Sequence, residues 1–101
     1  MLLELNVIPL GRGRSMSGDI AELVKIIDAS GVDYQLTAEG TILEGEWDRV
    51  MDVAKKCHQQ MRMKTDRVIT IMHADDYDGR VGRLEGAVDS VESKLGKPVH
   101  H

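Results

Sequence analysis

The chain has 101 residues, of which 42% are apolar and 30% charged, and its formal net charge is -4. This length suits one domain with a modest core, and the acidic balance argues against a nucleic-acid partner held by a basic field. No apolar run approaches the roughly 18 residues that a membrane helix needs, so we expect no membrane partner.

Residues 2–8 predict a first strand whose side chains alternate between two faces. Leu3, Leu5 and Val7 share the expected core face, while Leu2, Glu4, Asn6 and Ile8 share the other. Pro9 ends the strand because it has no N–H to donate. With Glu4 inside this strand and no basic leader, we expect no signal peptide. The single cysteine cannot form an internal disulfide, so we expect a reducing, cytoplasmic location.

A glycine-bounded loop, 11–18, precedes an amphipathic helix that reaches Ser30 and ends at Gly31. Ser15 or Ser17 suits the helix cap. The loop also carries Arg12 and Arg14, which together with the serines and the helix N-terminus could hold an anion. The alternative is a capped, solvated loop without a ligand.

Residues 34–47 predict a hairpin, around which the chain is organised. Tyr34 to Thr37 alternate large and polar side chains, residues 38–40 form the turn, and Thr41 to Glu46 return. We expect Tyr34, Leu36 and Leu43 to face the core. Gln35, Thr37, Ile42 and Glu44 then face the opposite side of the sheet.

The second half of the chain predicts a helix from Trp47 to about Met61 or Met63, a strand over 68–74 and a helix over 82–95. The apolar stripe of the helix that starts at Trp47 contains Trp47, Val50, Met51, Ala54, Cys57 and Met61. Cys57 is therefore expected to be a core thiol. The apolar seam of the predicted helix over 82–95, which is one side of that helix, contains Leu84, Val88, Val91 and Leu95. The acidic segment 75–79 lacks the ligand pattern of an EF-hand, which favours a solvated turn.

The order β-α-β-β-α-β plus a C-terminal helix predicts a single α+β domain over residues 1–98 with a ferredoxin-like fold. Both of the first two helices would cover one face of a four-stranded antiparallel sheet. The open face would carry Leu2, Ile8, Ile42, Ile69 and Ile71, which is too apolar to be left in water. We therefore expect a homodimer or homotetramer that pairs sheet against sheet.

Polar groups on this face need partners. Asn6, Gln35, Thr37 and Glu44 could pair across subunits, or could be the convergent polar groups of a ligand pocket. Spacing alone leaves both interpretations open. His73 fits an interface residue better than a metal ligand, and Cys57 and His58 are adjacent on a helix and diverge. We expect no catalytic residues, no metal and no required cofactor.

Four short segments, Asn6 to Gly11, Tyr34 to Thr37, Gly40 to Gly45 and Asp66 to Val68, resemble the thiamine-binding protein family, a YkoF-like family long catalogued as uncharacterised. The resemblance implies a ferredoxin-like fold, dimers or tetramers built through the sheets, and binding of thiamine or its hydroxymethylpyrimidine part in some members. It places the ligand residues at Asn6, Gln35, Thr37 and Glu44. The loop departs from the family pattern, because Arg12 and Arg14 stand where small hydroxyl residues are usual.

The sequence thus predicts a homo-oligomeric protein that binds thiamine or a related pyrimidine without converting it. A carboxylate and amides match the donors and acceptors of an aminopyrimidine, and Glu44 or Glu4 would suit a thiazolium cation. The alternative is a structural or regulatory oligomerisation module without a small-molecule ligand. A third hypothesis is an enzyme that acts on a phosphorylated small molecule through Arg12 and Arg14.

Overall fold

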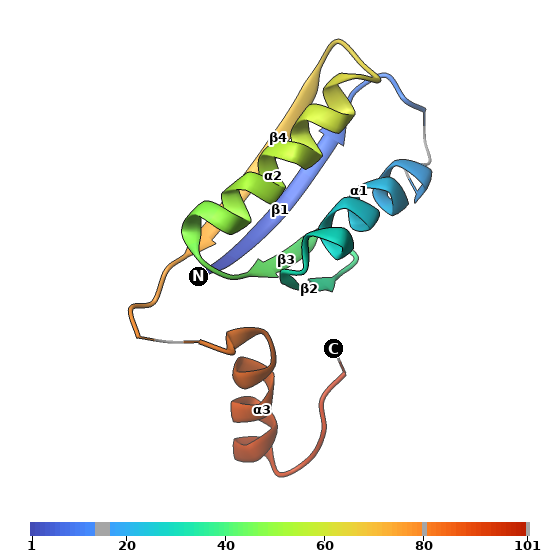
Figure 1. Cartoon of the computed structure of the whole chain (residues 1–101). Helices are drawn as coiled ribbons and strands as arrows, with labels where there is room; N and C mark the ends of the chain where they lie inside the picture. Colours follow the sequence, from blue (N-terminus) through green and yellow to red (C-terminus); the bar gives the residue numbers. More distant parts are fainter. Residues whose placement is uncertain (14–16, 80, 101) are drawn as a thin grey trace.

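The computed structural model describes residues 1–13, 17–79 and 81–100. Its elements are β1 (Leu2–Pro9), α1 (Ser17–Ser30), β2 (Asp33–Leu36), β3 (Thr41–Glu44), α2 (Trp47–Arg62), β4 (Val68–Asp75) and α3 (Arg83–Leu95). The strands form one antiparallel sheet in the order β2-β3-β1-β4. Figure 1 shows α1 and α2 together over one face of this sheet and α3 set apart from them. The predicted ferredoxin-like order is confirmed.

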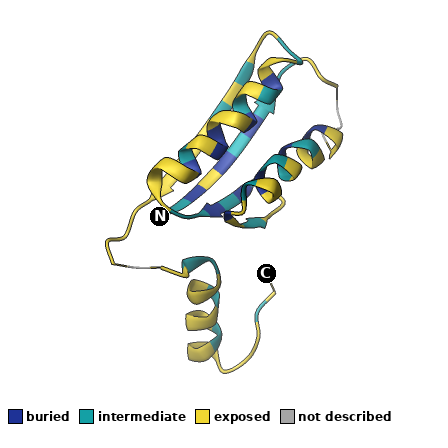
Figure 2. Ribbon diagram, viewed as in Figure 1, coloured by how far each residue is buried: buried dark blue, intermediate teal, exposed yellow. Residues whose placement is uncertain are grey.

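The central strand β1 separates a buried face from an open one. Leu3, Leu5 and Val7 are each at most 6% exposed and face α1 and α2, whereas Glu4 on the other face is exposed. On β4, the open-face residues Ile69 and Ile71 are 40% and 54% exposed. The faces therefore divide as the alternation predicted, with the core under the two helices (Figure 2).

The core is closed by the buried stripes of the two covering helices. From α1 it receives Leu23 and Ile27, and from α2 it receives Val50, Val53, Ala54, Cys57 and Met61. Cys57 is fully buried, and burial raises the pKa of its thiol to about 11, which confirms the predicted core thiol. Its neighbour His58 turns toward β4, where Nδ1 lies 2.6 Å from the Thr70 hydroxyl.

Two predicted core residues are exposed instead. Trp47 is 52% exposed, because it is the first residue of α2 and the buried side of this helix starts at Val50. Leu36 is 51% exposed at the end of the edge strand β2, where it lines an open groove beside α1. The apolar periodicity identified the helix and the strand, but it did not show where the covering layer ends.

The loop before α1 is tied to the body through Asp19. The Arg12 guanidinium lies 3.1 Å from the Asp19 carboxylate, and the Lys64 ammonium lies 3.5 Å from it and also pairs with Glu22. The hydrogen bond from Arg12 holds the pKa of Asp19 below its ordinary value. Of the two predicted cap residues, Ser17 is the first residue of α1, whereas Ser15 lies outside the described residues, as does Arg14.

None of the helices in the described part of the chain is long and apolar enough to span a bilayer.

The β2–β3 turn is built by a side-chain clasp. The Thr37 hydroxyl accepts hydrogen bonds from the Glu39 and Gly40 backbone N–H groups and donates to the Gly40 carbonyl oxygen. Asn6 donates from Nδ2 to the Glu39 carbonyl oxygen, which joins the turn to β1. At Gly40 a Cβ atom would lie 2.9 Å from the Leu5 carbonyl oxygen, so only glycine allows this approach.

We predict that Gly40→Ala destabilises the fold by about 1–3 kcal/mol, because the added methyl group must displace backbone rather than a mobile side chain. Gly18→Ala is the matched control, since nothing lies within 4 Å of its Cβ position in the first turn of α1. That substitution should be neutral or stabilising, because alanine favours a helix. Urea unfolding measures both changes, and equal free energies of unfolding would refute the steric explanation.

Candidate functional site

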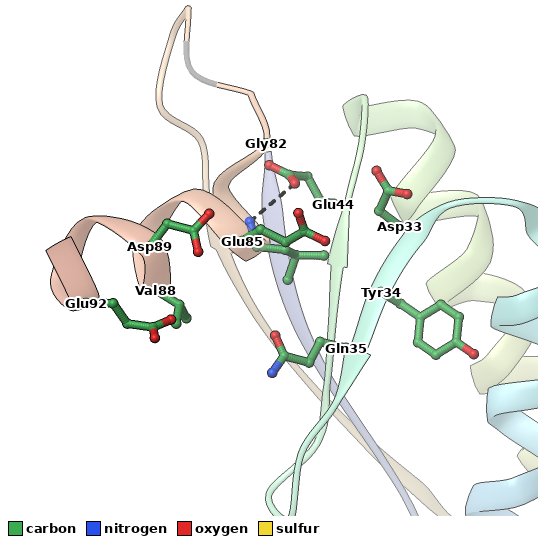
Figure 3. Close-up of a pocket in the computed structure, with 10 residues that line it drawn as sticks. Asp33, Tyr34, Gln35, Glu44, Gly82, Glu85, Val88, Asp89 and Glu92 are labelled. Carbon is green, nitrogen blue, oxygen red and sulfur yellow. Dashed lines mark hydrogen bonds between the residues drawn. The ribbon is translucent and has the colours of Figure 1, made fainter. Parts of the chain in front are cut away.

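A cleft of about 600 Å³ lies between α3 and the paired strands β2 and β3. The sheet contributes side chains from its open face, and α3 contributes one side of its helix (Figure 3). Its lining residues are Asp33, Tyr34, Gln35, Glu44, Gly82, Leu84, Glu85, Val88, Asp89 and Glu92. Two of the four predicted ligand residues, Gln35 and Glu44, therefore share one site.

Register explains why the sheet side of the cleft is polar. Asp33 pairs with Glu44, and Gln35 pairs with Ile42, so both rows of open-face side chains point the same way. Tyr34 points to the other face, where its hydroxyl donates to the Asp28 carboxylate on α1 at 3.2 Å. The alternation of β2 thus directs the Gln35 amide into the cleft and the Tyr34 phenol away from it.

Glu44 holds α3 in place. Its carboxylate accepts hydrogen bonds from the backbone N–H groups of Arg83, at 2.7 Å, and Leu84, at 3.3 Å; Figure 3 draws one of these bonds. The helix begins after Gly82, which has no side chain to cap it. A carboxylate from a distant strand therefore does what an N-cap side chain usually does.

Arg83 makes a second attachment beside the first. Its guanidinium pairs with the Asp75 carboxylate at 2.6 Å, donates to the Asp75 carbonyl oxygen at 3.2 Å, and lies 5.6 Å from the ring centre of Tyr77. The hydrogen bond from Arg83 holds the pKa of Asp75 below its ordinary value. Because α3 has no buried side chain among its described residues, polar contacts at its first turn position the helix.

The cleft is acidic. Among its described lining residues are the carboxylates of Asp33, Glu44, Glu85, Asp89 and Glu92, with no lysine, arginine or histidine. The Glu92 carboxylate also accepts a hydrogen bond from the Val99 backbone N–H at 3.2 Å. Such a lining favours a cationic ligand and disfavours an anion.

Sequence reasoning missed the acidic side chains of α3. Glu85, Asp89 and Glu92 stand at spacings of four and three residues, which places them on one side of a helix. That stripe was a usable signal, but only the fold shows that it faces Gln35 and Glu44. The predicted seam of α3 is partly confirmed, because Leu84 and Val88 line the cleft whereas Val91 and Leu95 are 54% and 52% exposed.

Asn6 and Thr37 do not join the cleft. Both line a separate, mainly apolar groove of about 810 Å³ between α1 and the β2–β3 turn. Each also makes a hydrogen bond at the β2–β3 turn. The four residues predicted as one ligand set are thus divided between the cleft and this groove.

No group of three or more histidine, cysteine, aspartate or glutamate side chains in the described part of the chain is placed to hold a metal ion. His73 lies opposite Glu4 on the open face. Asp75, which opens the acidic turn, is bound by Arg83.

Comparison with known proteins identifies the family. The thiamine-binding protein family matches residues 3–92. This chain belongs to that family. A UPF0045 protein from Methanothermobacter thermautotrophicus is 35% identical over 95 residues, covering 91% of this chain and 96% of its own. The UPF0045 protein YqgV of Bacillus subtilis is 31% identical over 100 residues, covering 93% and 96%.

Solved structures of similar proteins have the same fold. The Methanocaldococcus jannaschii protein MJ1052 has a TM-score of 0.82 at 24% identity, covering 89% of this chain and 93% of its own. The Thermotoga maritima protein TM0486, provisionally described as a thiamine biosynthesis/salvage protein, has a TM-score of 0.77 at 20% identity, covering 89% and 96%. The predicted family and fold are both confirmed. UPF0045 is the designation of an uncharacterised family and names no class of enzyme.

We predict that Glu44→Ala loosens α3 without disturbing the sheet. The substitution removes the acceptor of two backbone N–H groups, and losing a helix cap typically costs about 0.5–2 kcal/mol. Amide hydrogens of α3 should then exchange up to about 30-fold faster, as measured by mass spectrometry, while those of β1 keep their rate.

Glu46→Ala is the matched control for this experiment. Glu46 stands at the N-cap of α2 and makes no side-chain capping bond. Equal exchange of α3 in the two variants would contradict the assignment of Glu44 as its cap.

Proposed function

We propose that this protein binds thiamine, or its hydroxymethylpyrimidine part, in the cleft between α3 and β2–β3, and that it does not convert the ligand. The observation that carries the proposal is the acidic cleft itself, in a member of the thiamine-binding protein family. A volume of about 600 Å³ is within the range of small-molecule sites.

The chemistry of the cleft suits the two halves of such a ligand. The Gln35 amide offers one acceptor and two N–H donors, which match the adjacent nitrogen atoms of an aminopyrimidine. The carboxylates around it suit a thiazolium cation. Leu84 and Val88 supply apolar contact from α3.

Binding without conversion is supported by the kinds of group in the cleft. Its described lining consists of carboxylates, one amide, one phenol directed elsewhere and apolar groups. The thiol of Cys57 is buried in the core with a raised pKa, so it is not available as a nucleophile. Arg12, which the hypothesis of a phosphate-directed enzyme requires, is engaged with Asp19.

We expect thiamine to raise the melting temperature, because a ligand at 100 times its Kd stabilises the native state by about 2.7 kcal/mol. Hydroxymethylpyrimidine should act in the same direction. Gln35→Ala should reduce the thermal shift, whereas Gln59→Ala, an exposed amide on α2 outside the cleft, should not. A wild-type protein that responds to neither compound would favour the alternative, an oligomerisation module without a small-molecule ligand.

We also propose that a second copy of the chain covers the β1–β4 half of the open face, forming a homodimer or a tetramer of such dimers. Ile69 and Ile71 are exposed there beside Ile8, in an apolar row that pairing would remove from water. The α3 cleft lies over the other half of the sheet, against β2 and β3. Assembly and ligand binding can therefore occur together.

We predict that Ile71→Lys converts the oligomer to a monomer, because the charge would be buried without a partner. Met63→Lys is the matched control, since Met63 is 81% exposed just after α2 and lies away from the open face. Light scattering coupled to size exclusion gives the mass of each. A wild-type monomer at micromolar concentration would refute the proposed pairing.

A further inference from the structure

The strongest unexplained feature of the cleft is the uniform sign of its charge. Asp33 and Glu44 come from the sheet, and Glu85 and Asp89 come from α3, so two separate elements present carboxylates to the same space. In Figure 3 the Glu85 side chain is directed from α3 toward the strands. No ion pair between described residues involves these four carboxylates.

Some carboxylates elsewhere in the described chain are in ion pairs, unlike these four. Asp19 and Glu22 are paired with Arg12 and Lys64, Asp52 with Lys56, and Asp75 with Arg83. The one arginine of the first turn of α3 illustrates the contrast, because its guanidinium is directed to Asp75 and Tyr77 and does not line the cleft. The described lining of the cleft therefore contains carboxylates but no lysine, arginine or histidine side chain.

This arrangement works against the stability of α3. Glu85 and Asp89 are four residues apart and Asp89 and Glu92 three, so like charges are neighbours on the helix surface and repel each other. The helix also lacks a buried side chain that would offset this cost among its described residues. A cation between α3 and the strands would relieve the repulsion and draw the helix toward the sheet.

We infer that the α3 carboxylates Glu85 and Asp89 determine ligand specificity by admitting an unphosphorylated organic cation and rejecting its phosphate esters. The inference rests on the proposed function and extends it to the choice among forms of the ligand. A phosphate monoester adds about -1.5 to -2 charges at pH 7, so a cationic ligand that carries one becomes neutral or anionic. Placed among these carboxylates, its phosphate group would be repelled and would find no cationic partner in the described lining.

Isothermal titration with thiamine, thiamine monophosphate and thiamine diphosphate tests the inference at low and at high salt. In the wild-type protein we expect each ester to bind at least about tenfold more weakly than thiamine at low salt, since a like charge a few ångströms away costs on that order. High salt should narrow the difference, because it screens partly exposed charges.

The decisive variant is Glu85→Gln with Asp89→Asn, which keeps the side-chain volumes and removes the repulsion within α3. This double variant should bind thiamine more weakly than the wild type. The Kd of thiamine diphosphate divided by the Kd of thiamine should fall several-fold. The control is Asp48→Asn with Asp66→Asn, which changes the net charge equally at exposed positions that do not line the cleft. It should leave the ratio unchanged.

The possible results separate the two proposals. If the esters bind the wild type as tightly as thiamine does, or if the double variant leaves the ratio unchanged, the specificity inference is overturned while thiamine binding stands. If none of the three compounds binds the wild type, the proposed function fails and the specificity inference fails with it.

Discussion

The central strand β1 buries one row of side chains and exposes the other, because its side chains alternate and α1 and α2 cover only one face of the sheet. It is hydrogen-bonded to β3 on one side and to β4 on the other. Leu3, Leu5 and Val7 hold the two covering helices on one face. The same alternation fixes the opposite face, through register, on every strand paired with β1. A shift of one residue would exchange the core for the surface that carries the proposed interface and cleft.

Glu44 connects this frame to the candidate site. It stands at the end of β3, opposite Leu2 of β1 and Asp33 of β2, and its carboxylate accepts the first backbone N–H groups of α3. The helix is positioned mainly by this cap and by the pairing of Arg83 with Asp75. The shape of the cleft therefore depends on the position of α3, which a few polar contacts hold. The opposite face of the sheet is fixed by the packed core under α1 and α2.

The open face is divided between two uses. The β2–β3 half faces α3 and carries polar side chains around the cleft, whereas the β1–β4 half exposes isoleucines together with Glu4 and His73. The division explains why the polar residues of the face do not all converge. Asn6 and Thr37 are hydrogen-bonded to the turn that Gly40 allows, and only Gln35 and Glu44 meet the acidic stripe of α3.

The amino-acid sequence by itself determined the elements, their order and the two faces of the sheet, because these follow from local periodicity, from glycine and proline positions and from the length of the chain. It also supplied the family, through short segments such as Gly40 to Gly45. Tertiary structure decided the rest. Whether Leu36 or Trp47 is covered depends on where the neighbouring layers end. That Glu44 caps α3 depends on contacts with residues about 40 positions away in sequence. The acidic cleft exists only because strand pairing and helix capping bring separate carboxylates together.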